Sequence, residues 1–548
     1  MRLLLPLALY ALALAVRLLA ATELPFPTTE SSAYYVGVAQ NLVSGTGLVS
    51  DGVWSYATPP LEVPKPAFEL WLPMSTFVSA ASMVLLGSSF WAAQVGGAVL
   101  GAAVAPLAWA IGREAARAQA LDARRGRAVA ITSGLLAAIL SPLVLGSIVP
   151  DSYTPFTVFM LVAALLIPRV IGTRNGLDHV AAPSVLAGLG LGSALGLAYL
   201  SRQEVIWMGL VVLLMQGWVL RRQPTGGRLR EGVRRLWPVF VGGLVVVVPW
   251  LARNYAELGS PFPGQAVENM FLVRNEDIFA FSDRPDAATY LAQGAATVLS
   301  NPVHAAWDGL LTVIVFPAFP VGIAGLLALA GMRRAPALRR PTALVAVLAS
   351  SLLIFLSTML LFPVATRWGT FMHSSGPLLV GLGVVAALGG DALLARVSRL
   401  RGWERPNTIV APVALVAMAV LFTVFQVRLF GDQSTVTQTH YEGLAAALAS
   451  SAEDGDATMP ATIITDHPMW LAGATGGYAV VLPDEDIESV LALGDTFDTS
   501  WLVVMGGRGR YPGALLDPAA RTCLAADPAA LDAAGAEAWL FRLAEECA

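Results

Sequence analysis

The sequence predicts an α-helical polytopic membrane protein with a small α/β domain at its C-terminal end. Three observations carry this prediction: 56% of the 548 residues are hydrophobic, only 13% are charged, and the mean hydropathy is +0.66. Soluble domains carry about 25% charged residues, so a water-soluble chain of this composition would lack a polar surface. The composition excludes a cytosolic enzyme, a disordered protein and a collagen, and the pI of about 5.8 argues against a nucleic-acid binder.

About 11 segments are long and apolar enough to cross a bilayer, which takes roughly 20 mostly apolar residues. These predicted spans are 3–20, 90–112, 127–149, 152–171, 181–200, 203–220, 236–251, 306–332, 342–363, 369–390 and 407–427. A further apolar stretch, 66–87, is long enough but carries Glu69 and Pro73.

The positive-inside rule decides whether 66–87 crosses the membrane. If it does not, five arginine-rich loops lie on one side and, with Arg2, hold 22 of the 34 basic residues. These loops are 113–127, 169–180, 221–235, 333–340 and 391–406. We therefore expect 66–87 to be a helix embedded in or lying on the outer interface, with Trp71 in the aromatic belt.

This topology places the chain in a bacterial plasma membrane with its N-terminus cytoplasmic. The membrane domain is then 1–427, with outside loops at 21–89 and 252–305, and 428–548 is an extracytoplasmic domain. A cleaved signal peptide is the alternative for the first span, because small residues follow it at Ala20 and Ala21.

The segment 428–548 differs sharply in composition, with 18 acidic and 5 basic residues. Three short apolar runs, 461–466, 478–483 and 501–506, predict buried strands, and 487–494 predicts a helix between them. Both cysteines, Cys523 and Cys547, lie here, and an outside location permits a disulfide. Two unpaired thiols are the alternative.

Carboxylates at the edge of a membrane are costly and are therefore functional candidates. Glu30 lies at the N-terminal end of a predicted amphipathic helix over 31–44, where the helix dipole favours a negative charge. Asp151 lies in the two-residue turn between two spans. The alternatives are a helix-start acid for Glu30 and a structural N-cap for Asp151.

Outside cations are the second group of candidates. Lys65 is the only lysine in the chain, and a compact ammonium suits a lipid phosphate, although a plain ion pair with Glu62 or Glu69 is the alternative. Three arginines lie at outside ends of spans, on the side that the positive-inside rule depletes: Arg202, Arg253 and Arg367. Arg17, inside the first span, is expected to snorkel or to pair within the bundle.

Other catalytic patterns are absent from the sequence. The five histidines show no HxxxH or HxH spacing, and only His373 lies near the other candidates. There is no P-loop, no GxSxG and no haem pattern, so a zinc hydrolase is poorly supported.

Several motifs follow one another in a specific order between residue 10 and about residue 390. They are Glu30 with Tyr34 and Tyr35, then AQNL and GTGL; Lys65 and Pro66 before Trp71; the turn Pro150 and Asp151; LSRQE; and PWLARNY-x-x-x-GSPF. In this order they resemble the GT-C superfamily of polytopic glycosyltransferases. The bacterial branch of aminoarabinose transferases, protein mannosyltransferases and lipopolysaccharide sugar transferases is the most similar.

The resemblance implies inverting transfer of a hexosyl or pentosyl group from a polyprenyl-phosphate-linked sugar to an envelope glycan, lipid or protein, on the outer face of the plasma membrane. It implies that Glu30 is the general base or orients the acceptor, that Asp151 is the second carboxylate, and that Lys65 contacts the lipid phosphate. We expect Arg253 or Arg367 to assist Lys65. Further candidate substrate contacts are Tyr34, Glu69, Arg202 and His373.

The sequence departs from the family pattern at three places. Thr29-Glu30 replaces an Asp-Glu pair, Pro64 replaces an acid before Lys65, and no Asp-x-Asp follows in the second outside turn. No metal ligands are assigned, and a divalent cation is left open. The expected partners are the lipid-linked sugar, its acceptor and membrane lipids, with no nucleic acid. The alternative functions are a transporter or flippase of lipid-linked solutes and a non-catalytic protein whose tail binds envelope partners.

Overall fold

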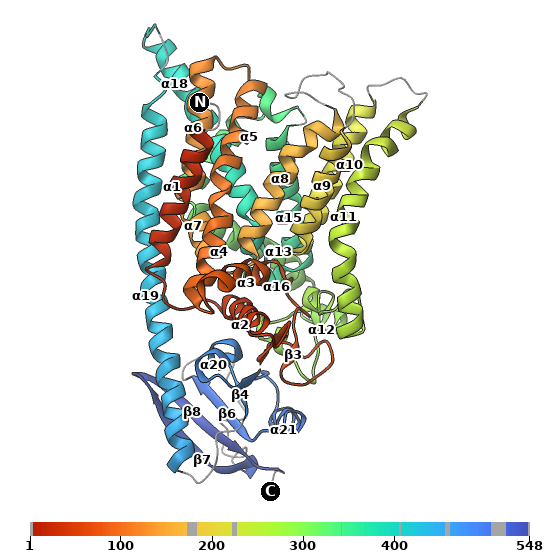
Figure 1. Ribbon diagram of the computed structural model, residues 1–548, viewed down its shortest axis with the longest axis vertical. Coiled ribbons are helices and arrows are strands. Elements are labelled where there is room, and N and C mark those ends of the chain that lie inside the picture. The colour runs from red at the N-terminus through yellow and green to blue at the C-terminus, as the bar shows by residue number, and fades with distance from the viewer. Residues whose placement is uncertain are drawn as a thin grey trace.

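The computed structural model describes residues 4–172, 184–221, 227–340, 342–367, 369–404, 407–454, 461–505 and 522–545. Within these residues, a bundle of long helices adjoins a smaller region of short helices, loops and a six-stranded sheet (Figure 1). The predicted architecture, a polytopic helical protein with a C-terminal region of strands and helices, is confirmed.

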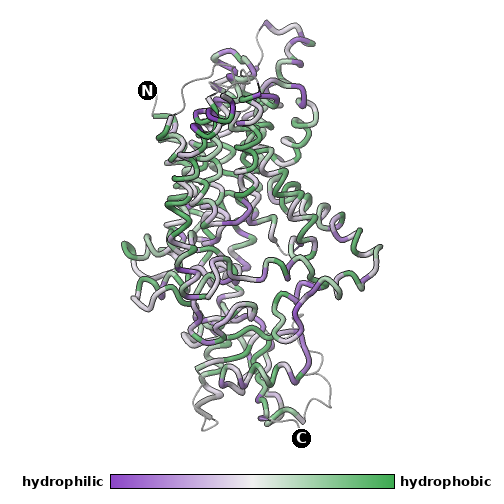
Figure 2. Tube along the Cα trace, turned by 90° about the vertical axis from the view of Figure 1, so that its right-hand side faces the viewer, coloured by the Kyte–Doolittle hydropathy of each residue, from purple (hydrophilic) through white to green (hydrophobic). Residues whose placement is uncertain are grey.

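The described residues contain nine helices that are long and apolar enough to cross a membrane, or ten if the bent pair α6 and α7 forms one span. The chain is therefore a multi-pass membrane protein. Hydrophobic residues dominate the middle of the bundle, as Figure 2 shows. The helices of the predicted spans are α1 (Leu4–Ala21), α4 (Phe90–Ala102), α5 (Val104–Ala118), α6 (Ala123–Ile139), α7 (Ser141–Ile148), α8 (Tyr153–Ile171), α9 (Val185–Tyr199), α10 (Ile206–Arg221), α11 (Arg228–Leu258), α13 (Ala295–Gly309), α14 (Val321–Met332), α15 (Ala343–Leu361), α18 (Gly376–Leu400) and α19 (Val410–Asp454).

Two of the predicted spans differ from single straight helices. The predicted span 306–332 is wrong as one helix: α13 runs into a π-helical turn over Leu310–Val315, and α14 begins only at Val321. Pro317 and Pro320 lie between them, and a proline has no N–H group to continue a helix. The predicted span 181–200 contains α9, which has 15 residues, while 181–183 lie outside the described residues.

Several helices end at other residues than predicted, because hydropathy detects the apolar part of a helix but not the polar turns that continue it. α11 covers Arg228–Leu258, and α18 begins at Gly376, after two short helices, α16 (Pro363–Arg367) and α17 (Thr370–Ser374). α19 runs without a break through residue 427, where the last span was expected to end. The predicted domain boundary at 427/428 therefore falls inside a helix.

Arg17 connects α1 to the break between α6 and α7, which are bent by 46°. Pro142 lacks an N–H group, so the carbonyl of Ala138, four residues earlier, has no helical donor. Arg17 Nη1 donates to this carbonyl at 3.0 Å, and Nε donates to Ser147 Oγ at 3.0 Å. The guanidinium is fully buried, so Arg17 pairs within the bundle rather than snorkelling.

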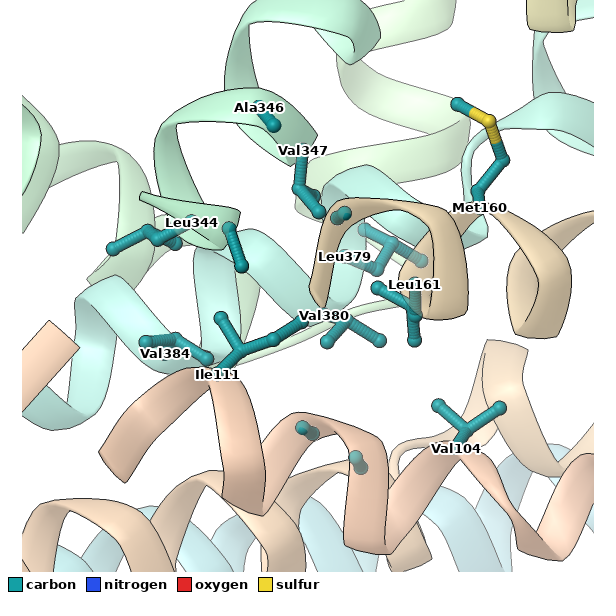
Figure 3. Close-up of a cluster of buried hydrophobic side chains, with 14 of the residues drawn as sticks. Val104, Ile111, Met160, Leu161, Leu344, Ala346, Val347, Leu379, Val380 and Val384 are labelled. Atoms are coloured by element: carbon teal, nitrogen blue, oxygen red, sulfur yellow. The ribbon is translucent and has the colours of Figure 1, made fainter. Parts of the chain in front are cut away.

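The apolar core of the bundle lies between α5, α8, α15 and α18, which contribute the side chains of Figure 3. α9 and α11 pack closely against each other through glycines, since small residues let the backbones of membrane helices approach. A Cβ atom on Gly192 would lie 2.0 Å from the carbonyl oxygen of Val239, and one on Gly242 would lie 2.3 Å from that of Leu189. The two backbones are thus in direct contact.

The segment between α1 and α4 forms a lower layer at the end of the bundle nearest the sheet (Figure 1). The helix predicted at 31–44 is confirmed as α2 (Glu30–Ser44), with Thr29 as its N-cap. The prediction of one helix over 66–87 is only partly correct, since the helix is α3 (Met74–Leu86). Lys65–Pro66 instead forms strand β3, paired with β1 (Val49–Ser50), because two prolines, Pro66 and Pro73, disfavour an earlier helix start.

The sheet at the C-terminal end has the strand order β2-β5-β4-β6-β8-β7. The three predicted strands are confirmed as β4 (Thr462–Thr465), β5 (Tyr478–Val481) and β6 (Trp501–Met505), and the predicted helix as α21 (Ile487–Thr496). The hairpin of β7 (Leu524–Ala533) and β8 (Ala536–Leu543) was not predicted. Cys523 is buried beside it, and Cys547 lies outside the described residues.

Strand β2 (Gly52–Val53) comes from the loop after α2 and pairs in parallel with β5. Residues of both long loops, among them Val53, Tyr56 and Phe279, are buried in the same apolar cluster as the sheet. The C-terminal sheet region, defined here as the described residues of 461–545, is thus packed together with the two loops that the sequence analysis places outside the membrane.

Candidate active site

A cavity of about 700 Å³ lies where the helix bundle meets the C-terminal sheet region. Four parts of the chain line it: the loops beside α2 and α3, the start of α10 with the loop after α11, the segment of α15 to α17, and α20 (Pro468–Thr475) with the residue before it. Its charged and titratable lining residues are Glu30, Arg202, Glu204, His373 and His467. Three of the predicted site residues, Glu30, Arg202 and His373, are therefore brought to one cavity.

Glu30 is the first residue of α2, and its side chain is only 9% exposed. Oε2 lies 3.2 Å from His467 Nδ1 and accepts from the indole N–H of Trp54 at 3.4 Å, while Oε1 accepts from the backbone N–H of Met469 at 3.4 Å. The carboxylate therefore lies at the N-terminal ends of two helices, α2 and α20, where helix dipoles stabilise negative charge.

Asp151 lies directly behind the cavity wall. Oδ2 accepts from Ser31, the neighbour of Glu30, at 3.0 Å, and Oδ1 lies 2.9 Å from His373 Nδ1. Oδ1 also accepts from the backbone N–H of Tyr153 at 3.1 Å, so Asp151 helps to cap α8. Burial alone would raise the pKa of the Asp151 carboxyl, but His373, with Arg202 and Ser152, holds this pKa well below its usual value.

Arg202 is the one arginine among the described residues that line the cavity. Its guanidinium donates to Glu204 Oε1 through Nε at 3.0 Å and through Nη2 at 2.6 Å, and to Ser152 Oγ at 3.1 Å. Ser152 in turn donates to Asp151. Arg202, His373 and Asp151 thus form one connected polar network on the bundle side of the cavity.

Lys65, Glu69 and Tyr34 line a separate, much smaller pocket that shares Trp54 and Trp71 with the large cavity. Lys65 is 1% exposed, forms an ion pair with Glu69 and donates to the carbonyl of Ser55 at 3.0 Å. Burial lowers the pKa of Lys65 and raises that of Glu69, although their attraction opposes both shifts. Lys65 thus pairs with Glu69, as one alternative for it expected, and its contact with a lipid phosphate stays a prediction.

Tyr34 is buried between these residues and the bundle. Its hydroxyl accepts from the backbone N–H of Phe68 at 2.6 Å, and its ring packs against Trp71.

Arg253 and Arg367 are not among the residues that line either pocket. Arg253 donates to the carbonyls of Ala67 at 2.7 Å and Leu48 at 3.3 Å, and so holds β3 and the loop before β1 against α11. Arg367 pairs with Asp308 at 2.7 Å and is largely exposed. The structure does not bring either arginine to the cavity.

Sequence reasoning missed His467, Trp54 and Trp470 as lining residues. A signal for His467 was present, because it directly follows the strand predicted over 461–466. Side chains at the carboxyl ends of parallel strands meet at one edge of a sheet, where ligands often bind. Among the residues that the structure describes, no group of three or more His, Cys, Asp or Glu side chains could hold a metal ion.

No family model matches the chain, and no curated protein matches it. Two solved structures match over nearly the whole length, both of ArnT, an aminoarabinose transferase, from Cupriavidus metallidurans. The structure bound to undecaprenyl phosphate has a TM-score of 0.54 and 14% identity, with 98% of each chain covered. The apo structure has a TM-score of 0.54 and 15% identity, with 99% of this chain and 98% of the other covered. The chain therefore shares the fold of these ArnT structures, as the resemblance of its motifs to aminoarabinose transferases led us to expect.

Proposed function

We propose that this protein is an integral-membrane glycosyltransferase that moves a sugar from a polyprenyl-phosphate-linked donor to an envelope lipid, glycan or protein. The observation that carries the proposal is the cavity at the end of the bundle, in which the carboxylate of Glu30, 9% exposed, faces the same space as Arg202 and His373. The fold shared with an ArnT structure bound to undecaprenyl phosphate supports a lipid phosphate as the leaving group.

The orientation of the molecule supports transfer on the extracytoplasmic face. Figure 1 shows the N-terminus and the connection between α5 and α6 at one end of the bundle and the sheet at the other. The α5–α6 connection belongs to the arginine-rich segment 113–127, and such segments stay on the cytoplasmic side. The cavity is at the opposite end, next to the sheet, which accords with an extracytoplasmic C-terminal region.

The proposed reaction is a displacement with inversion at the anomeric carbon of the donor sugar. The acceptor oxygen forms the new bond to this carbon, the bond from the carbon to the phosphate oxygen breaks, and polyprenyl phosphate leaves with the electron pair. Glu30 takes the acceptor proton or orients the acceptor, since a general base must lie within hydrogen-bond reach of that proton. Glu30 suits this role because its carboxylate lines the cavity.

Asp151 suits a supporting role better than that of base, because its depressed pKa makes its carboxylate a weaker proton acceptor. We propose that it orients His373 and Ser31, both of which it contacts. The charge that develops on the leaving phosphate needs cations already in place. Arg202 and His373 are the lining groups available for this, whereas Lys65 would first have to exchange its partner Glu69 for the phosphate.

The test is sugar transfer by Glu30→Gln, which keeps the size of the side chain but removes its basicity. Purified membranes are supplied with a radiolabelled polyprenyl-phosphate sugar, and covalent product is measured. We expect at least a hundredfold loss of transfer, since acid–base catalysis contributes about 10²–10⁴-fold. Glu62→Gln, an exposed acid in the same loop, is the matched control and should transfer normally.

Wild-type turnover in Glu30→Gln would refute the role of Glu30. Uptake of the labelled solute by wild-type vesicles without covalent transfer would support the transporter alternative instead.

A further inference from the structure

Glu30 is contacted by the C-terminal sheet region as well as by its own loop. His467 follows β4, and its Nδ1 lies 3.2 Å from Glu30 Oε2. The backbone N–H of Met469, in the first turn of α20, donates to Oε1 at 3.4 Å. Both oxygens of the carboxylate therefore meet groups from a part of the chain that lies outside the helix bundle.

The ring of His467 is held in place on several sides. Its Nε2 lies 3.7 Å from Oδ2 of Asp466, a carboxylate that is almost completely buried. Its face packs on Trp470 at a centroid distance of 5.1 Å, and the indole N–H of Trp470 donates to the carbonyl of Pro27 at 3.0 Å. An imidazole whose own orientation is fixed in this way can in turn fix the orientation of the Glu30 carboxylate beside it.

The sheet region is also fixed relative to the loops that carry Glu30 and the cavity wall. β2 pairs with β5, and the hydroxyl of Tyr56 donates to the carbonyl of Val481. Glu485 accepts from three successive backbone N–H groups in the second loop, those of residues 281–283. The position of His467 therefore depends on several contacts between the sheet region and the two loops, not on one hydrogen bond.

We propose that the C-terminal sheet region is part of the active site and that His467 is a positioning residue for the Glu30 carboxylate. The proposal rests on the function proposed above for Glu30. His467 and the Met469 N–H fix the two oxygens at the cavity wall, where the carboxylate would meet the acceptor hydroxyl. A reacting group displaced by about 1 Å costs on the order of a hundredfold in rate, so a holder of this kind affects kcat.

The first experiment compares kcat and KM of sugar transfer for His467→Ala and His467→Asn. We expect His467→Ala to lower kcat about tenfold or more while the KM for the lipid-linked sugar changes little, because Glu30 loses the imidazole that lies 3.2 Å from its Oε2. His467→Asn should restore most of kcat, because an asparagine amide N–H can reach the position that Nδ1 occupies beside Glu30 Oε2. Tyr56→Phe is the matched control for a weakened contact between the sheet region and the loops, since it removes a hydrogen bond to Val481 that does not involve Glu30.

Two results would overturn the assignment. One is wild-type kcat in His467→Ala. The other is an equal loss in His467→Ala, His467→Asn and Tyr56→Phe, which would show that His467 only helps to dock the sheet region.

A second readout does not require sugar transfer. Carbodiimide modification of Glu30, followed by mass spectrometry with exposed Glu62 as the internal reference, reports how firmly the carboxylate is held. We expect faster modification in His467→Ala than in the wild type and in His467→Asn, and equal rates would refute the pairing. If the wild type transfers no sugar, the proposed function fails, while this measurement still decides whether His467 holds Glu30.

Discussion

Arg17 is expected to stabilise the bend between α6 and α7, and Arg17→Met tests this expectation. Methionine fills most of the same volume without a charge or a hydrogen-bond donor. The carbonyl of Ala138 then has no partner, because Pro142 cannot supply the helical one. An unsatisfied buried acceptor costs about 1–3 kcal/mol, and loss of a buried cation at a helix C-terminus costs up to about 2 kcal/mol more.

We expect Arg17→Met to lower the free energy of unfolding by about 3 kcal/mol, the middle of the range that these two costs give together. The other acceptors are less affected, since Ser147 still donates to the carbonyl of Leu143 at 2.6 Å. Replacing a buried ion by an apolar group can be neutral when its partners are replaced as well. Here the partners are backbone carbonyls, which remain.

The assay is denaturant-induced unfolding in detergent micelles, followed by tryptophan fluorescence. Tyr10→Phe is the matched control on the same helix, since it removes one hydrogen bond at an exposed position, to the carbonyl of Val99, and should cost less than about 0.5 kcal/mol. An Arg17→Met protein as stable as the wild type would refute the reasoning, because it would show that the bend needs no donor.

Three further outcomes are expected from unfolding measurements of the same kind. Gly192→Ala should lose about 1–3 kcal/mol of stability, because its Cβ would overlap the Val239 carbonyl. Gly209→Ala, with open space around it, should not lose stability. A Gly192→Ala protein as stable as the wild type would contradict the close contact of α9 and α11. Lys65→Met should lower the free energy of unfolding by about 3–5 kcal/mol, because Glu69 is left buried without its cation. The further change Glu69→Leu should recover most of this loss. Weaker binding of the lipid-linked sugar at unchanged stability would instead favour a role of Lys65 in binding the lipid phosphate. Asp151 has a folded-state pKa below its unfolded value, so its stabilising contribution is complete above pH about 4 and is lost as the pH falls towards the folded-state pKa. Asp151→Asn should therefore flatten the fall of the unfolding temperature between about pH 4 and pH 3, and an unchanged profile would argue against this depressed pKa.

The parts of the fold that the sequence predicted well are those with strong local signals. The helix at Glu30 has an N-cap and a terminal glycine, and β4, β5 and β6 are short apolar runs between turn residues. The hairpin of β7 and β8 was missed because β7, rich in alanine and aspartate with one proline, has low strand propensity. The break before α14 was missed because hydropathy does not register prolines within an apolar run.

For the candidate site, the sequence predicted at which end of the bundle each residue lies, but not which residues contact one another. Glu30, Arg202 and His373 share one end of the bundle and do line one cavity, although their roles stay predictions. The partners of Arg253 and Arg367 depend on tertiary contacts, with backbone carbonyls in one case and Asp308 in the other. No local pattern contains that information, and the same holds for the contact of His467 with Glu30.

The length of α19 has a consequence for where an acceptor would have to meet the proposed active site. It is one helix of 45 residues, which at about 1.5 Å per residue measures roughly 68 Å. The hydrocarbon layer accounts for about 30 Å of that length, so the rest projects towards the sheet as a rigid rod. Because α19 packs against β7 and α20, helix geometry sets how far these parts of the sheet region lie from the membrane. An acceptor for the proposed transfer would have to bring its hydroxyl to the cavity, where the bundle meets the sheet region, which favours molecules anchored in or lying on the same leaflet.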